Sequence, residues 1–254
     1  MPGARVSIRL VRHATLVVTY GDSRLLVDPM LAPAGSTPPI ENAPNERRNP
    51  LVELPDLDID AVDAVLLTHL HRDHLDDAAV ERLPADLPVL CQPADEPALS
   101  ERGFEDVRPV ADRRRWNDLA VIRTPGRHGR GDLADRMGPV AGYVLQAGSG
   151  PTLYLAGDTV WYDGVRRTLE AHDPDAIVLN AGGAQFRTGD PITMTHEDVA
   201  AVCEHTTDPM VIAIHMEAIN HCLETRSALA DALAGSACGD RLEIPADGEW
   251  ISVT

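Results

Sequence analysis

The 254-residue sequence contains no lysine, so all 22 of its basic residues are arginine. This absence excludes Schiff-base and lysine-nucleophile chemistry. No stretch approaches the ~18 consecutive apolar residues of a membrane span. The first residues, 1–5, run directly into a strand pattern without the apolar segment of a signal peptide. We therefore expect a protein that is not associated with a membrane.

Cysteine and positive charge are also scarce. Cys91, Cys203, Cys222 and Cys238 are widely spaced and form no Cys-x-x-Cys pair. This spacing predicts free thiols in a reducing cytoplasm rather than a disulfide framework or a structural zinc site. The 40 acids against 22 bases give a formal net charge of -18. Such a surface repels phosphate backbones and anionic lipids, so we expect a small-molecule substrate and no nucleic acid. A homo-oligomer remains possible.

The densest cluster of potential metal ligands follows a short apolar run. Residues 61–67 are mostly apolar and include two β-branched valines, which indicates a buried strand. His69, His71, Asp73 and His74 come directly after it. Imidazole and carboxylate are the ligands expected for zinc, and they also suit manganese or iron. A solvated polar turn is the alternative. The chain has only ten histidines, however, and three of them within six residues are more than chance placement would give.

The pattern His-x-His-x-Asp-His resembles the signature of the metallo-β-lactamase superfamily, and within it the branch similar to the ascorbate-6-phosphate lactonase. The resemblance implies two divalent metal ions, with Zn²⁺ as the first expectation and Mn²⁺ or Fe²⁺ as alternatives. It also implies a set of ligands in chain order, each at or just beyond a predicted strand end: His69, His71, Asp73, His74, His128, Asp158 and His215.

The same resemblance suggests supporting residues, each with a purely structural alternative. Asp28 would orient a ligand histidine by hydrogen bonding, and His13 would lie near the site. Asn180 ends a buried strand at a close-approach turn, and Tyr162 could wall a pocket. Asp73 is the candidate base as well as a ligand, and His221 is a candidate acid or substrate contact.

Strand and helix patterns alternate along the chain in two similar halves, about 1–125 and 126–254. The resemblance implies one domain of the α/β class, a four-layer αββα sandwich with the metals at one edge of two sheets. The first strand is expected over residues 4–10. Residues 30–55 are expected to form a long loop, either a lid or a plain surface excursion. Residues 113–115, all arginine, indicate a solvated turn, and Asp247-Gly248 indicates a hairpin.

The function these features favour is metal-dependent hydrolysis of a small ester, lactone or phosphorylated substrate. Arg127, Arg130 and Arg187 are candidates for binding an anionic group on it. A phosphodiesterase or nuclease of the same fold is one alternative, although the acidic charge opposes it. An iron-dependent redox enzyme on the same scaffold is another, and a metal-dependent binding protein without activity is a third.

Overall fold

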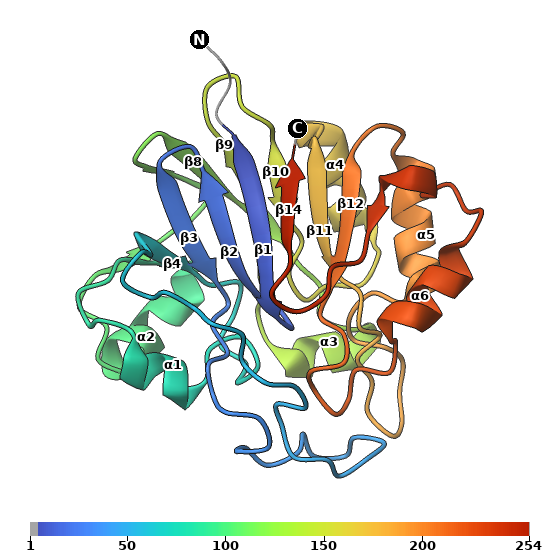
Figure 1. The fold of residues 1–254 in the computed structure, drawn as a ribbon, viewed down its shortest axis with the longest axis horizontal. Coiled ribbons are helices and arrows are strands. Elements are labelled where there is room, and N and C mark those ends of the chain that lie inside the picture. Colours follow the sequence, from blue (N-terminus) through green and yellow to red (C-terminus); the bar gives the residue numbers. More distant parts are fainter. Residues whose placement is uncertain (1–4, 254) are drawn as a thin grey trace.

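Two seven-stranded sheets form the framework of the computed structural model, which describes residues 5–253 (Figure 1). The first sheet has the order β14-β1-β2-β3-β4-β5-β6 and the second β13-β12-β11-β10-β9-β8-β7. The strands of the first are β1 Val6–Arg12, β2 Thr15–Tyr20, β3 Ser23–Val27, β4 Ala64–Leu66, β5 Val89–Cys91, β6 Val107–Pro109 and β14 Trp250–Val253. Those of the second are β7 Arg113–Trp116, β8 Leu119–Pro125, β9 Ala141–Gln146, β10 Leu153–Leu155, β11 Ala176–Asn180, β12 Met210–Ile214 and β13 Leu242–Glu243.

Each sheet combines antiparallel and parallel strands in mirror order. Strands β3 to β6 run parallel, as do β10 to β13. The carboxyl ends of parallel strands meet at one edge of a sheet, and the connections that leave them carry the functional side chains of α/β proteins. The division between the sheets falls after Pro109 rather than at residue 125, and β14 returns from the end of the chain to pair with β1.

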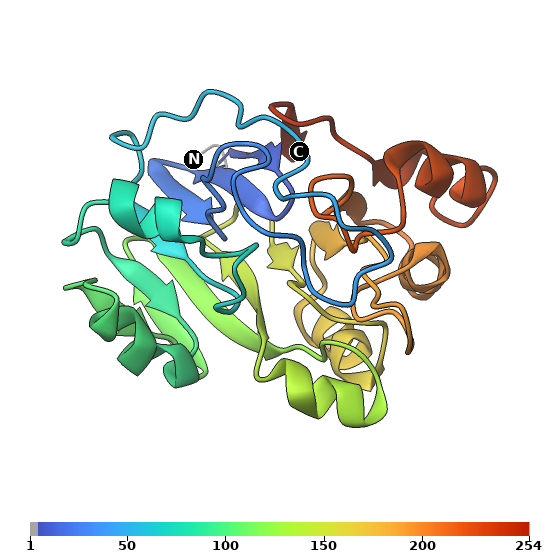
Figure 2. The ribbon, with the colours of Figure 1, turned by 90° about the horizontal axis from the view of Figure 1, so that it is seen from below.

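A long segment, residues 30–55, crosses the face below these strand ends (Figure 2). It contains no helix or extended strand, as predicted, and its one ladder contact is a bridge between Thr37 and Asn49. The buried Arg12 guanidinium donates to the carbonyls of Met30, Ala32 and Val52, which fixes both ends of the segment. The segment is therefore an ordered wall over this face of the molecule.

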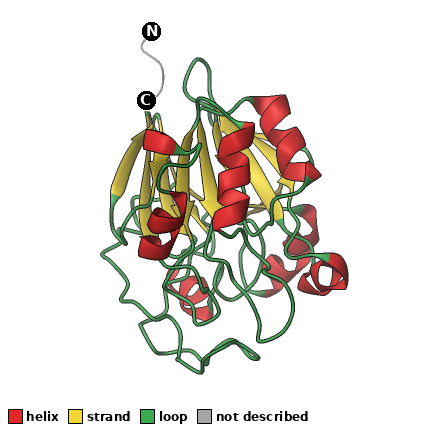
Figure 3. Cartoon of the chain, turned by 90° about the vertical axis from the view of Figure 1, so that its right-hand side faces the viewer, coloured by secondary structure: helices red, strands yellow, loops and turns green. Residues whose placement is uncertain are grey.

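Helices cover the outer face of each sheet (Figure 3). They are α1 Asp77–Arg82 and α2 Glu96–Glu101 on the first sheet, and α4 Asp163–His172, α5 His196–His205 and α6 Arg226–Leu233 on the second. Helix α3 Gly131–Met137 lies below the strand ends instead (Figure 1), and short 3-10 turns occur at Pro93–Asp95 and Gly239–Arg241. Thr195 caps the start of α5, because its side chain accepts from the backbone N–H of Asp198. None of the helices in residues 5–253 combines the length and apolar character that crossing a bilayer requires.

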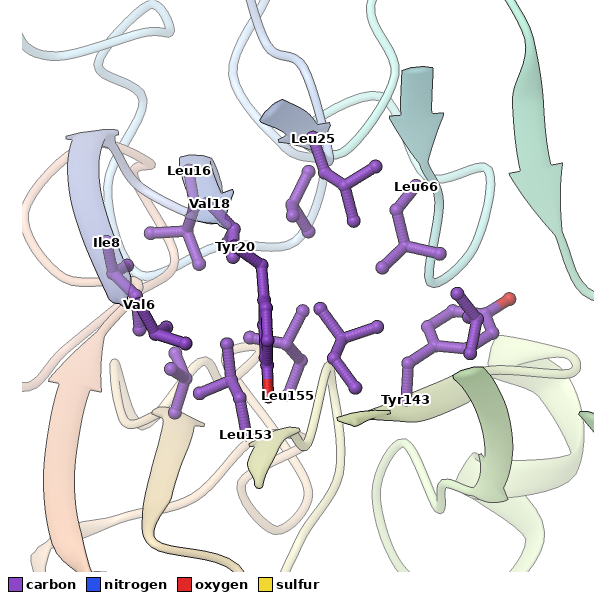
Figure 4. Close-up of a cluster of buried hydrophobic side chains, with 14 of the residues drawn as sticks. Val6, Ile8, Leu16, Val18, Tyr20, Leu25, Leu66, Tyr143, Leu153 and Leu155 are labelled. Atoms are coloured by element: carbon purple, nitrogen blue, oxygen red, sulfur yellow. The ribbon is translucent and has the colours of Figure 1, made fainter. Parts of the chain in front are cut away.

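Three buried apolar layers hold these elements together. One lies between the sheets, where Ile8 and Leu16 of the first face Leu153 and Leu155 of the second (Figure 4). A second lies between the first sheet and α1 and α2, and a third between the second sheet and α4, α5 and α6. Three apolar layers between helix, sheet, sheet and helix make the four-layer αββα sandwich that the sequence predicted.

Two local predictions were wrong, and a third falls partly outside the described residues. The three arginines at 113–115 belong to β7, an edge strand that pairs with β8. The strand ends at Trp116, which is buried. No hairpin forms at Asp247-Gly248, because β13 and β14 belong to different sheets and the Gly248 amide donates to the Leu10 carbonyl. The first strand begins at Val6, and the residue at which it was predicted to start, Ala4, lies outside the described residues.

The cysteines also differ from the prediction. Cys203 on α5 forms a disulfide with Cys238, which lies beyond α6. Cys91 and Cys222 are free thiols, as expected. The pairing joins α5 to the segment that follows α6. The two helices pack against each other, and this proximity is a tertiary feature that cysteine spacing does not encode.

Candidate metal centre

Seven side chains with nitrogen or oxygen donor atoms meet where the strands of the two sheets end. Their strands are β4, β8, β10 and β12, and each donor residue follows its strand within eight residues of its end. The seven are those singled out from the sequence: His69, His71, Asp73, His74, His128, Asp158 and His215. All are buried except His71, which is partly exposed.

Asp158 lies at the centre of the cluster. Its Oδ2 atom is 3.3 Å from the Nε2 atoms of both His74 and His128, and its Oδ1 atom is 3.3 Å from Nε2 of His215. Two ligand atoms bound to one tetrahedral zinc, each at about 2.0–2.1 Å, lie roughly 3.3–3.4 Å apart. The donor spacing around this carboxylate therefore fits metal ions, with Oδ2 toward His74 and His128 and Oδ1 toward His215.

The histidines are fixed by hydrogen bonds outside the cluster. His71 donates from Nε2 to the carbonyl of Met137 at 3.1 Å, and His128 donates from Nδ1 to the carbonyl of Ile192 at 2.8 Å. In each ring the other nitrogen faces the cluster; Nδ1 of His71 lies 2.9 Å from Nε2 of His69. Metal-binding histidines are held in this way, with one nitrogen on an outer partner and the other free to ligate.

Asp28 lies beneath the cluster and accepts hydrogen bonds from His74 and from Thr68. Its Oδ2 accepts from Nδ1 of His74 at 2.8 Å and from the Thr68 hydroxyl at 2.6 Å, and its Oδ1 accepts from the Thr68 amide at 2.8 Å. The Thr68 oxygen is in turn 3.0 Å from Nδ1 of His69. One buried carboxylate thus orients His74 directly and His69 through Thr68, a residue that sequence reasoning passed over although it begins the histidine segment.

Two further side chains contact the donor residues Asp73 and His215. Nε2 of His13 donates to Oδ2 of Asp73 at 3.0 Å, and the His13 ring lies 3.7 Å from that of His215, between centroids. The thiol of Cys222 is 3.6 Å from Nδ1 of His215. His13 was a candidate from the sequence, whereas Cys222 was not, since a single cysteine seven residues beyond a histidine has no motif.

The structure separates Asn180 and Tyr162, which the sequence analysis had grouped together. Nδ2 of Asn180 donates to Oδ1 of Asp158 at 2.6 Å. In the turn after it, a side chain at Gly182 would overlap the carbonyl oxygen of His215, so this position requires glycine. Tyr162, which was predicted to wall a pocket, packs instead against the apolar layer under α4 and lines neither cavity at the cluster.

The electrostatics of the cluster favour a cation. Burial alone raises the pKa of Asp158, but His215, His74 and His128 lower it well below 3.8, so the carboxylate is ionised. Burial lowers the pKa of His69 and of His215 well below 6.5, which leaves neutral imidazoles able to ligate. Burial also lowers the pKa of His74, yet the surrounding carboxylates raise it well above 6.5 overall. The carboxylates that raise the pKa of His74 are Asp158, Asp28 and Asp73, so this side of the cluster carries negative charge that attracts a cation.

A cavity of about 230 Å³ opens onto the cluster, and we call it the reaction chamber. Its lining combines polar side chains of the cluster with apolar ones, and consists of His71, Asp73, His128, His221, Ile40, Met137, Phe186 and Arg72. Burial lowers the pKa of His221 to about 4, so its imidazole is neutral at pH 7.

The three arginines proposed as anion contacts lie outside the chamber lining. Arg130 pairs with Asp198 at 3.2 Å, and Arg187 donates to the carbonyl of Ala43 at 2.8 Å. The Arg127 amide donates to the Thr159 hydroxyl, but its side chain is not among the lining residues.

Comparison with known proteins agrees with this geometry. A family model described as the beta-lactamase superfamily domain matches residues 23–216. The chain belongs to the metallo-β-lactamase superfamily. Its relatives include the UPF0173 protein YddR of Bacillus subtilis, 36% identical over 250 residues, which are 96% of this chain and 98% of the relative. The UPF0173 metal-dependent hydrolase PF1764 of Pyrococcus furiosus is 25% identical and aligns over 72% of this chain and 75% of its own.

Two solved structures of this superfamily are similar over nearly the whole chain. An isothiocyanate hydrolase from Delia radicum gut bacteria has a TM-score of 0.91 and 35% identity, covering 96% of this chain and 98% of its own. A possible metal-dependent hydrolase from Veillonella parvula has a TM-score of 0.91 and 33% identity, covering 98% of each chain. The chain is thus a member of a family of metal-dependent hydrolases. Its resemblance to the lactonase branch stays a prediction.

Proposed function

We propose that this chain is a hydrolase that uses two divalent metal ions, zinc in the first instance, on a small uncharged electrophile. The observation that carries the proposal is the reaction chamber, in which the donor cluster faces an apolar wall of Ile40, Met137 and Phe186. A wall of this kind suits a neutral group such as an ester, a lactone or an isothiocyanate. The similarity to an isothiocyanate hydrolase supports the last of these.

The donor atoms fall into three overlapping groups, which are His69, His71 and His128; His13, Asp73, His74 and His215; and His69, His74 and Asp158. In the proposed arrangement His69, His71 and His128 would hold one ion, Asp73, His74 and His215 the other, and Asp158 would serve both. When bound, the metal ions would lower the pKa of a water molecule toward neutrality and polarise the electrophile. Phosphorylated substrates have less support, since Arg127, Arg130 and Arg187 lie outside the chamber lining and Arg72, which lies in it, is accompanied there by the carboxylate of Asp73.

The chain's own residues account for proton movement. Asp73 lines the chamber and is ionised, because burial raises its pKa but His74 and His13 lower it well below 3.8. It would accept the proton of the attacking water. His13 would hold the Asp73 carboxylate in place through the 3.0 Å hydrogen bond. His221 would contact the substrate as a neutral imidazole, which is the second of its two expected roles, acid or substrate contact.

For an isothiocyanate, water adds across the R–N=C=S group. A bond forms between the water oxygen and the central carbon, one proton passes to Asp73 and then to nitrogen, and the product is a thiocarbamic acid. Cleavage of its carbon–nitrogen bond, with the remaining proton going to nitrogen, releases an amine and carbonyl sulfide. One water is consumed for each substrate, and no oxidant or reductant is needed.

The test combines a substrate panel with metal analysis. Purified protein would be assayed on an isothiocyanate, a lactone, an ester and a phosphodiester, with chelator and after zinc is restored. We expect hydrolysis of at least one carbon electrophile that chelator abolishes and zinc recovers. Absence of chelator-sensitive hydrolysis across the panel would refute the proposal, and one iron per chain instead of two zinc or manganese ions would favour the redox alternative.

The ligand assignment has its own test. His71→Ala should remove activity and lower the metal content, whereas His172→Ala, at the end of α4 and away from the cluster, should alter neither. Chelator should also lower the melting temperature of the unmodified protein, because a metal bound to the folded state stabilises it. Full metal stoichiometry in the His71 variant would contradict the assignment.

A further inference from the structure

A second and larger cavity adjoins the reaction chamber. Its volume is about 700 Å³, and it lies between residues 30–50 and the start of α1. The two cavities share three lining residues, Ile40, Arg72 and Asp73. The larger one therefore begins beside a donor of the cluster and leads away from it. By itself it falls within the roughly 300–1,000 Å³ of sites that hold small molecules.

The surface of this second cavity is mainly apolar. Met30, Ile219 and Ala78 form its sides, together with prolines 33, 38, 39 and 50. The carboxylate of Asp76 already has partners, because it accepts from the amide of Ala32 at 2.7 Å and also caps α1. These bonds leave an apolar space in which an uncharged group would lose little hydration energy.

The charges on the wall argue against an anionic occupant. Glu41, Asp73, Asp76 and Asp77 lie in the lining, against the single cation Arg72. Asp77 is paired with Arg102 at 2.9 Å, outside the cavity. A phosphate or carboxylate in this space would face a net negative wall, and the chain as a whole carries a formal charge of -18.

Asn220 holds residues 40–49, which contribute to the wall of the second cavity, in place. The side chain of Asn220, five residues beyond His215, accepts from the amide of Ile40 at 2.9 Å and from Nδ2 of Asn49 at 2.9 Å. It donates to the carbonyl of Asn45 at 2.8 Å. Asn220 is buried. These bonds fix residues 40–49 against the segment that follows β12, so the cavity is formed before any substrate enters it.

We propose that this cavity is the subsite for an uncharged apolar substituent of the substrate, such as an arylalkyl chain. The inference rests on the proposed function, since it places the reacting carbon in the reaction chamber and its substituent past Ile40 and Arg72. The enzyme would then prefer substrates whose electrophilic group bears a bulky apolar substituent over the same group with a methyl substituent.

The first arm of the test measures turnover. Methyl and phenethyl isothiocyanate would be compared by kcat/KM, and we expect at least about a tenfold preference for phenethyl, expressed mainly in KM. Ala78→Trp, which places a large side chain in the cavity, should reduce the preference at least about fivefold. Ala230→Trp, at an exposed position on α6, is the matched control and should keep it. Ala78→Phe serves if the tryptophan variant does not fold.

The second arm measures binding without turnover. Ligand-observed NMR would follow 2-phenylethanol, a neutral probe, and phenethyl phosphate, an anionic one. We expect the neutral probe to bind the unmodified protein and Ala230→Trp, and to bind the Ala78 variants at least about tenfold more weakly. Equal or tighter binding of the phosphate would overturn the assignment to an uncharged group.

The two arms separate the two proposals. Turnover with equal kcat/KM for both substituents, unaffected at position 78, would overturn the subsite and leave the hydrolase intact. Binding of 2-phenylethanol that depends on position 78, without turnover of any panel substrate, would support the subsite and refute the proposed function. Failure of the neutral probe to bind the unmodified protein would overturn the subsite.

Discussion

Replacement of Asp28 by asparagine offers a direct test of how the cluster is oriented. Asp28 has a φ of 43°, in the left-handed region, and asparagine tolerates this conformation better than most residues. The substitution therefore keeps the backbone and the side-chain shape. It changes only the charge and one of the two acceptor atoms, so its effect reports the chemistry of the carboxylate.

The expected magnitude follows from the three hydrogen bonds that Asp28 accepts. They come from the Thr68 amide, the Thr68 hydroxyl and Nδ1 of His74. An amide has one oxygen, so one side of the asparagine must present N–H groups to a donor. At least one hydrogen bond to a charged group is lost, at about 1.5–3 kcal/mol. Zinc affinity should fall by about 10- to 100-fold, the range for outer partners of metal ligands.

The assay is zinc binding by competition with a chromophoric chelator, alongside circular dichroism to confirm folding. Asp63→Asn is the matched control, since its exposed carboxylate accepts only from the Arg24 amide among the hydrogen bonds of the described residues. The control should bind zinc as the unmodified protein does. A dissociation constant for Asp28→Asn within about twofold of the control would show that the carboxylate does not orient the ligands.

Three further outcomes are expected. Burial raises the pKa of Asp95 from 3.8 to about 6, so the folded state holds its proton more tightly and stability falls as pH rises from about 4 to 6. Asp95→Asn should remove this fall and raise the free energy of unfolding by about 1–2 kcal/mol at pH 8 but not at pH 3, in urea titrations; an equal effect at both pH values would contradict the reasoning. Opening the Cys203–Cys238 disulfide, which spans 35 residues, should lower the free energy of unfolding by about 2–4 kcal/mol, and unchanged urea midpoints with and without reductant would count against it. Cys222→Ala should weaken zinc binding less than the Asp28 variant does, because sulfur is a weak acceptor, and a larger loss would reverse that ranking.

Much of the metal centre was predictable because its residues form local sequence patterns. His69, His71, Asp73 and His74 lie within six positions, and the other donors each follow an apolar run. Strand ends are where α/β folds gather side chains, so chain order and strand pattern together were enough to predict which residues meet.

The partners that fix those residues were less predictable. His71 and His128 donate to backbone carbonyls of Met137 and Ile192, and every residue has a carbonyl, so no side-chain signature marks them. The role of Asn220 depends on four backbone and side-chain groups far away in sequence. Such contacts are properties of the assembled fold.

The errors in the fold have related causes. Residues 113–115 form a strand because β8 offers a partner, and at a sheet edge exposed arginines are compatible with pairing and protect against aggregation. The disulfide and the separation of β13 from β14 likewise arise from packing between distant segments.

The pairing of β14 with β1 has a consequence for how this molecule is made. Ile8 is partnered by Ile251, so β1 lacks this neighbour at the sheet edge until residues 250–253 have left the ribosome. Contacts this distant in sequence slow folding, because a long loop must close before they contribute stability. During synthesis β1 would therefore present an open backbone edge, and the nascent chain has its greatest need of chaperones in that interval.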